Sequence, residues 1–344
     1  MYKKVLTLVL AVSVMLTFAG CGKGKDTSNE LDETSPKEEV VTDPISVEIK
    51  TYLDNFVNSD KRPIAVMIDN DNKDARPQAG MDEAYLVYEM PVEAGATRFM
   101  ALFRSTNTEK IGPVRSSRHY FLDFVKENNA IYTHFGWSPK AANDITSLKV
   151  NNINGVLGSD EGVFWRERKY KGDWHSAYTS IKNIEELAAQ KGYERDTNNQ
   201  NGIKYSTEYI NLSSENKALD VTLPYSNMYK TSYKYNEETG LYEKYIGSAA
   251  HEMQSGNVLA FKNVIIEFIV DKALGDGSAR REIITTGSGK GYYFTNGAYE
   301  EITWSKDSRT APTIYKKADG TELQINPGNT IINVINPNNG VTIK

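Results

Sequence analysis

The sequence predicts an α+β or α/β domain with a mixed sheet over 61–205, followed by a mainly-β domain over 225–344. Two observations predict this order. Apolar runs of strand length alternate with helix-like stretches in the first range, whereas short strand-like runs separated by Gly, Asn and Asp fill the second. The polar range 206–224 is predicted to be a junction. The chain has 344 residues, of which 39% are apolar and 25% charged, so it can build a core in both ranges.

Strands and helices are both expected in the first range. Continuous apolar runs predict three buried strands, at "RPIAVMID" (62–69), "AYLVYE" (84–89) and "ATRFMALFRS" (96–105). Ser138 followed by Pro139 predicts the start of a helix, because Ser caps a helix and Pro fits its first position. A second helix is predicted over "KNIEELAAQKG" (182–192), with Gly192 closing it.

The second range reads as strands throughout. "SYKYNEETGLYEKY" (232–245) predicts a hairpin of two Tyr-rich strands joined by turn residues. Further strand-like runs follow it, at 257–270, 281–287, 291–304, 312–325 and 329–335. Because Gly, Asn and Asp separate these runs, we expect an all-β sandwich or barrel.

The N-terminus has the pattern of a lipoprotein signal peptide over residues 1–20. Lys3 and Lys4 precede a mainly apolar run of 14 residues, "VLTLVLAVSVMLTF", which is short for a membrane span. "AGC" ends the run, and Cys21 is the single cysteine of the chain, so we expect lipid on Cys21 to anchor the protein in the membrane. The polar, acidic range 21–60 is predicted to be a disordered tether.

Charge narrows the classes of function. The chain carries 40 Lys and Arg against 45 Asp and Glu, and the loss of residues 1–20 would remove only two lysines. A net negative chain argues against a general nucleic-acid binder and against broad adhesion to an anionic membrane surface.

The stretch "IGPVRSSRHYFLDF" (111–124) is a candidate binding site, because two arginines flank a pair of serines. Ser116 or Ser117 can cap a helix that runs to about Lys126, which would put Arg115 and Arg118 at its positive end. Cations are unfavourable there, so we expect something negative beside them. An external phosphate or carboxylate is one possibility, and internal pairing with Asp69, Glu89 or Glu93 is the favoured one.

Two further arginines lie on the third predicted strand. Arg98 and Arg104 are six residues apart and so share a face, but about 20 Å of strand separates them. They cannot clamp one small phosphate together. Either each has its own partner or they bracket an extended groove.

Several segments together resemble the YerB-type lipoproteins of Gram-positive bacteria. These segments are "RPIAVMIDN" (62–70), "ARPQAGMDEAYLVYE" (75–89), "EAGATRFMALFRS" (93–105), "IGPVRSSRHYFLDF" (111–124), "GSGKGYYFTNG", "ITWSK" and "INPGNTIINVI". The resemblance covers about residues 60–340. It implies an extracytoplasmic, membrane-anchored protein built from two adjoining domains of unknown function, and it implies no reaction.

A second resemblance is confined to short pieces. "TRF" (97–99) and "PVRSSR" (113–118) are similar to parts of the LytR-CpsA-Psr enzymes, which transfer lipid-linked glycans and hold a polyprenyl pyrophosphate with arginines. This resemblance implies an envelope enzyme working at an arginine-lined cleft. The Arg-x-Asp-Thr sequence of that family is missing here.

The other motifs do not indicate a metal site or a catalytic site. The four histidines lack metal-binding spacing, and "DNDNKD" (69–74), which contains Asp69 and Asn70, lacks the Gly and Glu of a calcium loop and reads as a turn. We therefore expect no metal and no cofactor, and the sequence identifies no catalytic residue.

The candidate ligand-binding residues are Arg98, Arg104, Arg115, Arg118, Asp69 and Asn70. The function expected from all of this is that of a lipid-anchored protein on the outer face of the cytoplasmic membrane. It would bind or scaffold envelope components, either a protein or a wall polymer, without catalysis. The alternative is an enzyme that acts on phosphorylated, lipid-linked glycan at the same arginines.

Overall fold

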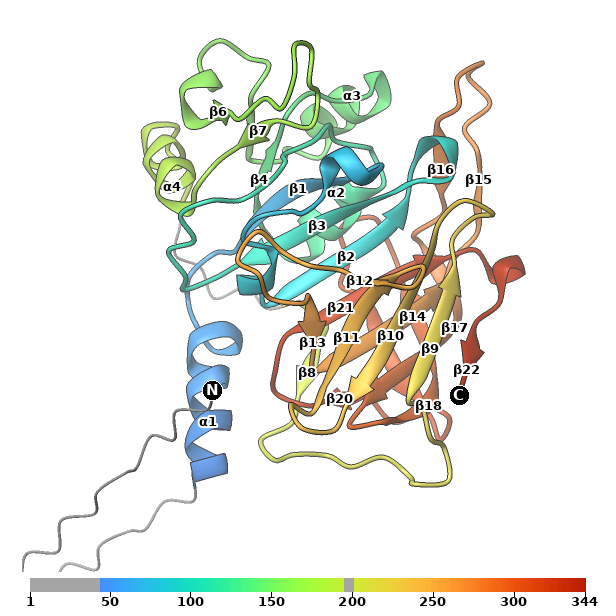
Figure 1. The fold of residues 1–344 in the computed structure, drawn as a ribbon. Helices are drawn as coiled ribbons and strands as arrows, with labels where there is room; N and C mark the ends of the chain where they lie inside the picture. Colours follow the sequence, from blue (N-terminus) through green and yellow to red (C-terminus); the bar gives the residue numbers. More distant parts are fainter. Residues whose placement is uncertain (1–43, 195–200) are drawn as a thin grey trace, which may run out of the picture. The chain divides into compact units, whose positions relative to one another are not determined.

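A ten-stranded mixed sheet forms the centre of the computed structural model, which describes residues 44–194 and 201–344 (Figure 1). Four neighbouring inner strands of this sheet are β1 (Ile64–Asn70), β2 (Leu86–Pro91), β3 (Thr97–Phe103) and β21 (Thr330–Ile335). All four are buried along their whole length, as their continuous apolar runs predict.

The remaining strands extend this sheet at both ends. They are β4 (Ile131–His134), β5 (Asn152–Asn154), β14 (Asn263–Phe268), β17 (Gly287–Thr295), β18 (Ala298–Lys306) and β19 (Ile314–Lys317). The strand order is β19-β18-β17-β14-β21-β2-β3-β1-β4-β5. Strands β1, β4 and β5 are parallel to one another, as are β2, β21 and β14, whereas β3 runs antiparallel to both β1 and β2.

A second sheet consists of strands from the C-terminal part of the chain. It contains β9 (Asp220–Pro224), β10 (Lys230–Asn236), β11 (Leu241–Ile246), β12 (Ala249–Ala250), β13 (Ala260–Phe261) and β22 (Thr342–Ile343). The predicted Tyr-rich hairpin is confirmed as β10 and β11. Three short strand pairs lie outside both sheets: β6 (Trp165–Arg166) with β7 (Ala177–Tyr178), β8 (Lys204–Tyr205) with β20 (Gln324–Ile325), and β15 (Asp271–Ala273) with β16 (Arg281–Ile283).

Three helices accompany the first part of the large sheet: α2 (Phe121–Glu127), α3 (Pro139–Ser147) and α4 (Ile181–Gln190). The predicted start at Ser138 is confirmed, and the helix predicted over 182–192 is present as α4, which begins at Ile181 and ends at Gln190. Ser138 accepts a hydrogen bond from the Ala141 amide, and Ser180 accepts one from the Asn183 amide. Helices α3 and α4 therefore each have one of their free N–H groups satisfied by a side chain.

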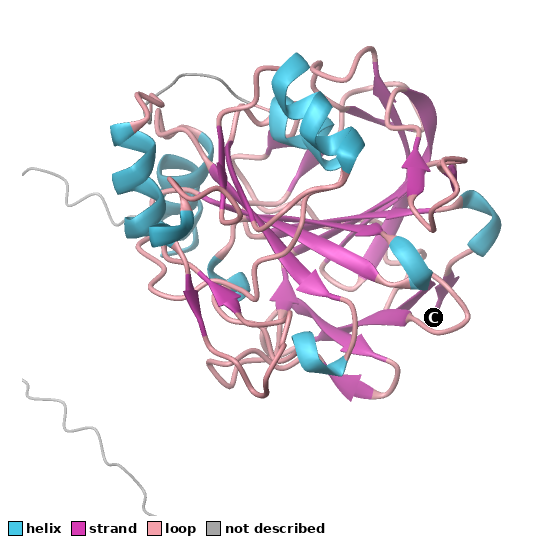
Figure 2. Ribbon diagram, turned by 90° about the horizontal axis from the view of Figure 1, so that it is seen from above, coloured by secondary structure: helices cyan, strands magenta, loops and turns pink. Residues whose placement is uncertain are grey.

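The large sheet separates two cores, and it runs through the middle of the molecule in Figure 2. Alternate residues of β1 supply the two sides, because successive strand side chains point to opposite faces. Ile64, Val66 and Ile68 join a core that includes α4 and the second sheet. Ala65 and Met67 join a core that includes α2.

The predicted fold class is confirmed: helices and a mixed sheet in the first part of the chain, mostly strands in the second. The two parts share the large sheet, because β21 pairs in parallel with β2 through Leu86↔Thr330 to Glu89↔Asn333. The boundaries 61–205, 206–224 and 225–344 stay a prediction.

The structure places helical residues at the end of the predicted tether. Residues 21–60 were expected to be disordered, but α1 (Pro44–Tyr52) and a π-helical turn (Leu53–Val57) occupy its end. Two aromatic side chains explain this correction. The Tyr52 hydroxyl donates to the Gly328 carbonyl at 2.7 Å, and the Phe56 ring stacks on Tyr85 at 6.1 Å. The predicted signal peptide and Cys21 lie outside the described residues, within which no helix is long and apolar enough to cross a membrane.

The stretch 111–124 also differs from its prediction. Helix α2 begins at Phe121 and has no side-chain cap, so neither serine caps a helix and the arginines are not at a helix end. The backbone before it is held extended by neighbouring segments. Arg115 N–H donates to the Met67 carbonyl and Ser117 N–H to the Gly136 carbonyl, both at 2.9 Å. These bonds to β1 and to the end of β4 outweigh the local helix signal.

A candidate anion site lined by arginines

The candidate site lies where β1 ends and β3 begins. Strands β1 and β3 pair in antiparallel orientation, and their register places Asp69 directly opposite Arg98. The loop that follows β3 returns to this end of the sheet, with Val114 bridged to Ile68, and this return brings Arg115 and Arg118 beside the strand ends. Residues 29 to 49 positions apart in the sequence from Asp69 thus meet at one edge.

An open cavity of about 420 Å³ lies at this edge, and we call it the arginine cavity. Its lining residues are Asp71, Val92, Glu93, Ala94, Arg98, Arg115, Arg118, Ser278, Ala279 and Arg280. Four guanidinium groups therefore face one space, alongside two carboxylates.

Arg118 has an internal partner. Its Nε lies 2.5 Å and its terminal Nη2 3.0 Å from the two carboxylate oxygens of Glu93, which is the two-pronged geometry that suits a guanidinium and a carboxylate. Burial acts to raise the pKa of Glu93, but Arg118 and then Arg98 outweigh it and hold that pKa below its ordinary value. Glu93 is therefore ionised at neutral pH.

Arg115 and His175 share the second carboxylate. Arg115 Nε lies 3.0 Å from Asp69 Oδ2, and His175 Nδ1 lies 2.6 Å from the same oxygen. Burial acts to raise the pKa of the fully buried Asp69, but His175 and then Arg115 lower it overall. The hydrogen bond to Asp69 in turn raises the pKa of His175. Asp69 is thus an anion held between two cations or donors.

Arg98 is the most buried of the four arginines at the cavity. It is 6% exposed, its Nη1 donates to the Ser116 carbonyl at 2.7 Å, and its Nη2 lies 3.8 Å from Glu93. Its Nε is buried and has no hydrogen-bond partner among the described residues. Burial, followed by the charge of Arg118, lowers the pKa of Arg98 to about 10. A buried guanidinium with an unpaired N–H is costly unless an acceptor reaches it.

The other predicted site residues lie elsewhere. Arg104 is near the opposite end of β3, where its Nη1 donates to the Phe56 carbonyl at 2.7 Å and its guanidinium lies over the Tyr85 ring. Asn70 and Glu89 belong to a buried polar network: Asn70 Nδ2 donates to Tyr229 at 2.7 Å, and Glu89 pairs with Lys244 at 2.7 Å. Cys21 is outside the described residues.

Three residues at or beside the cavity were not predicted from the sequence as site residues. His175 pairs with Asp69 across 106 positions, which no local pattern indicates. Asp71 was considered only as part of a turn. Arg280 reaches the cavity from the loop between β15 and β16, where its Nη1 lies 3.2 Å from Asp276.

The chemistry available here is electrostatic. Guanidinium groups bind phosphate and carboxylate oxygens with directed hydrogen bonds. His175, held at its Nδ1 by Asp69, adds an imidazole that can donate and accept a proton. Within those residues, no group of three His, Cys, Asp or Glu side chains has the arrangement of a metal site.

Comparison with known proteins places the chain in a family. A model described as "Protein of unknown function (DUF3048) N-terminal domain" matches residues 54–194, and the corresponding C-terminal domain matches 221–332. The chain is 33% identical over 284 residues to "Putative lipoprotein YerB" of Bacillus subtilis (strain 168), and the match covers 80% of this chain and 82% of that protein.

The fold agrees with this relationship. The crystal structure of the YerB protein from Bacillus subtilis matches with a TM-score of 0.74 at 30% identity, over 83% of this chain and 94% of the other. The resemblance seen in the sequence is thereby confirmed: the chain belongs to the YerB-type family, whose two domains are the N-terminal and C-terminal DUF3048 domains.

Proposed function

We propose that the protein is a lipid-anchored binding protein on the outer face of the cytoplasmic membrane, and that its arginine cavity holds an anionic group of an envelope component. The observation that carries this proposal is Arg98. It is a buried guanidinium whose Nε has no acceptor, and it faces a cavity shared with Arg115 and Arg118. An anion entering the cavity would supply the missing acceptor and add charge compensation.

The anchor rests on the N-terminal sequence. A lipoprotein signal would consist of Lys3 and Lys4, the apolar run and "AGC". The relative in Bacillus subtilis carries the name of a lipoprotein. Two acyl chains on Cys21 would hold the protein stably on the membrane, whereas one chain binds only marginally. Lipidation of Cys21 places the folded part outside the cytoplasm.

A phosphate-bearing wall polymer is the class of ligand that best suits the cavity. Phosphate offers several acceptor oxygens to guanidinium groups at once. Glu93 and Asp71 at the same cavity would disfavour a broad acidic surface, such as that of an acidic protein, and favour one compact anion. We therefore place an envelope protein second among the partners.

Binding of inorganic pyrophosphate to the full chain in detergent, measured by calorimetry, tests this proposal. We expect Arg98→Met to weaken binding about tenfold or more, because a hydrogen bond to a charged group contributes about 1.5–3 kcal/mol. Arg104→Met is the matched control, since Arg104 is also 6% exposed but lies away from the cavity. Equal loss in both variants, or no binding by the unmodified chain, would refute the proposal.

An enzyme that acts on phosphorylated, lipid-linked glycan is the second candidate function, and Asp69 with His175 is the observation that favours it. A carboxylate that orients an imidazole is a common arrangement for general acid–base catalysis. Against it, Arg118 and Arg115 already have carboxylate partners. Turnover of a polyprenyl-pyrophosphate-linked glycan that His175→Gln abolishes, with substrate binding retained, would establish the enzyme. Absence of turnover would exclude it for that substrate.

A further inference from the structure

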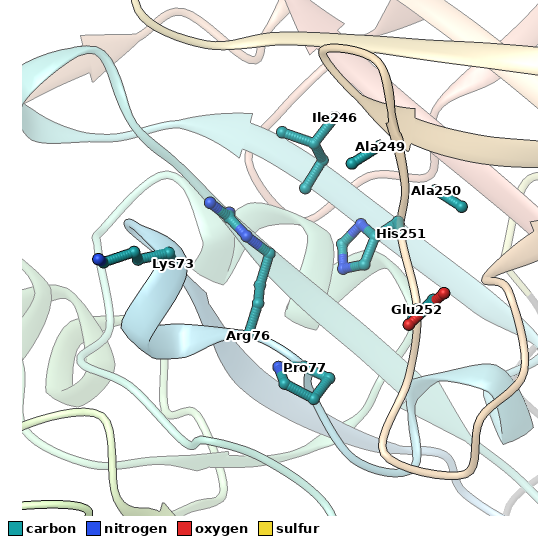
Figure 3. Close-up of a pocket in the computed structure, with 8 residues that line it drawn as sticks. All are labelled: Lys73, Arg76, Pro77, Ile246, Ala249, Ala250, His251 and Glu252. Carbon is teal, nitrogen blue, oxygen red and sulfur yellow. The ribbon is translucent and has the colours of Figure 1, made fainter.

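A second cavity is lined in part by the segment that follows β1. It has a volume of about 350 Å³, and its wall combines the short 3-10 turn Lys73–Ala75 and the residues after it with the end of β11 and strand β12 (Figure 3). Ile246, Ala249, Ala250 and Pro77 give it an apolar surface. None of its lining residues belongs to the arginine cavity.

Two cations at this cavity have no carboxylate partner. Lys73 is exposed and Arg76 half-buried, and within the described residues neither lies at ion-pair distance from an Asp or Glu. Arg76 uses one terminal nitrogen, Nη1, to donate to Asn70 Oδ1 at 2.8 Å. Its other nitrogens remain available to a ligand. An anionic group in the cavity would therefore meet two uncompensated positive charges.

A chain of hydrogen bonds fixes the orientation of the buried amides behind the cavity. The bond from Arg76 identifies Oδ1 as the side of Asn70 that faces it, because a guanidinium only donates. Gln78 Nε2 then donates to the backbone carbonyl of Asp69 at 2.9 Å and to Asn70 Oδ1 at 3.3 Å. The Gln78 carbonyl oxygen, Oε1, is consequently left as an acceptor for a neighbour.

That neighbour is His251, and the bond decides which of its nitrogens carries the proton. His251 Nε2 lies 2.8 Å from Gln78 Oε1, so Nε2 is the donor. Burial, followed by the charges of Lys244 and Arg76, lowers the pKa of His251 well below its ordinary value, so the ring is neutral at pH 7. In a neutral imidazole with a protonated Nε2, Nδ1 is an acceptor.

His251 Nδ1 has no hydrogen-bond partner among the described residues, although the side chain is only 2% exposed. Figure 3 shows the imidazole facing the space between the Arg76 guanidinium and Ile246. A buried acceptor without a partner is unfavourable, and such atoms are rare in folded proteins. A donor on a bound molecule would satisfy it.

We propose that this cavity binds a small anionic molecule that also carries a hydrogen-bond donor, with the anion at Lys73 and Arg76 and the donor at His251 Nδ1. The carboxylate of Glu252 also lines the cavity and offers a second acceptor to such a donor. The apolar residues Ile246, Ala249 and Ala250 contact the carbon skeleton. A phosphate ester or carboxylate with a hydroxyl, amide or ammonium group meets these requirements.

Two phosphate probes that differ in their donors test the proposal by calorimetry on the full chain in detergent. sn-Glycerol 3-phosphate carries hydroxyl donors, whereas propyl phosphate has the same phosphate and no hydroxyl. We expect glycerol 3-phosphate to bind about two- to tenfold more tightly, the usual net contribution of one hydrogen bond. Equal affinity for the two probes, or no binding of either, would overturn the proposal.

Two variants locate the binding. Lys73→Met, at an exposed position, should weaken the binding of both probes to a similar degree. His251→Gln keeps an N–H for Gln78 but moves the acceptor away from the position of Nδ1, so it should reduce the difference in affinity between the two probes. If His251→Gln does not fold, the Lys73→Met variant still tests the proposal. Unchanged binding of both probes by Lys73→Met would show that they do not bind in this cavity. Arg98→Met should leave the preference for glycerol 3-phosphate intact, which separates this site from the arginine cavity.

Discussion

Lys244 Nζ lies 2.7 Å from a carboxylate oxygen of Glu89, and neither side chain exposes any surface. Glu89 belongs to β2 of the large sheet and Lys244 to β11 of the second sheet, so this ion pair joins the two sheets. Thr97 and Tyr229 also donate to Glu89, each at 2.7 Å. The charge on Glu89 is therefore fully enclosed by donors, which is the condition under which a buried ion pair is tolerated.

Removing one member of this pair should be strongly destabilising. We expect Lys244→Met to lower the free energy of unfolding by about 3–5 kcal/mol, because it leaves the buried Glu89 charge without its cation. Urea unfolding of the full chain in detergent, followed by circular dichroism, measures the change. Lys230→Met, at an exposed position of the neighbouring strand β10, is the control and should alter stability by less than about 0.5 kcal/mol.

The double variant provides a sharper test of the same pair. Glu89→Gln combined with Lys244→Met removes both charges but keeps an amide oxygen for Thr97 and Tyr229. We expect it to be more stable than Lys244→Met alone, because no uncompensated charge remains. Additive losses from the two substitutions would show that the charges do not interact.

A different buried carboxyl predicts how stability changes with pH. Glu267 is 1% exposed, and burial raises its pKa to about 8, although the hydroxyl of Tyr315 donates to it. An unfolded Glu has a pKa of about 4.3. A raised pKa in the folded state means that the stabilising contribution is fully present below about pH 4.3 and is lost as the pH rises to about 8.

Glu267→Gln should remove this dependence, because the amide cannot ionise and its oxygen can still accept from Tyr315. Relative to the variant, the free energy of unfolding of the unmodified protein should fall by about 1.4 kcal/mol per pH unit between about pH 4.5 and 8. Chemical unfolding at several pH values measures the difference. Glu301→Gln, at an exposed position, should give a difference that does not change with pH in this way. Parallel pH profiles for Glu267→Gln and the unmodified chain would contradict the prediction.

The four histidines should separate in a proton NMR titration. Burial lowers the pKa of His119 and His251 and lowers that of His134 to about 4, whereas the hydrogen bond that His175 donates to Asp69 raises the pKa of His175. One imidazole should therefore titrate above about 6.5, the ordinary value, and the other three below it.

Two substitutions assign that resonance and its cause. Asp69→Asn should lower the highest of the four midpoints, because it removes the carboxylate that stabilises the imidazolium. Asp71→Asn is the matched control: Asp71 contributes less to His175 than Asp69 does, so the shift should be smaller. If Asp69→Asn left the highest midpoint unchanged, the pairing with His175 would be wrong.

Local signals predicted much of this fold. The apolar runs marked β1, β2 and β3, and Ser138 marked the start of α3, because each depends on neighbours within a few residues. The run "NTIINVI" predicted a strand but not that β21 would pair with β2. A buried strand has the same apolar pattern in any sheet, so its partner is decided by packing across the whole chain.

The site was predicted less well, for the same reason. Arg115 and Arg118 were expected near negative groups, and the structure places Asp69 and Glu93 beside them. The expected helix end was wrong, because hydrogen bonds to Met67 and Gly136 keep the stretch extended. His175 and His251 have partners that are 106 and 173 positions away, and no local pattern contains that information.

We expect lipid on Cys21 to hold the protein on the membrane. Cys21→Ala should abolish incorporation of labelled palmitate and move the protein from the membrane fraction to the soluble fraction, because two acyl chains provide the stable anchor. Cell fractionation with immunodetection measures both changes. Gly22→Ala keeps the cysteine and is the control that should stay on the membrane. Retention of Cys21→Ala in the membrane fraction after a high-salt wash would show that something other than lipid holds the protein there.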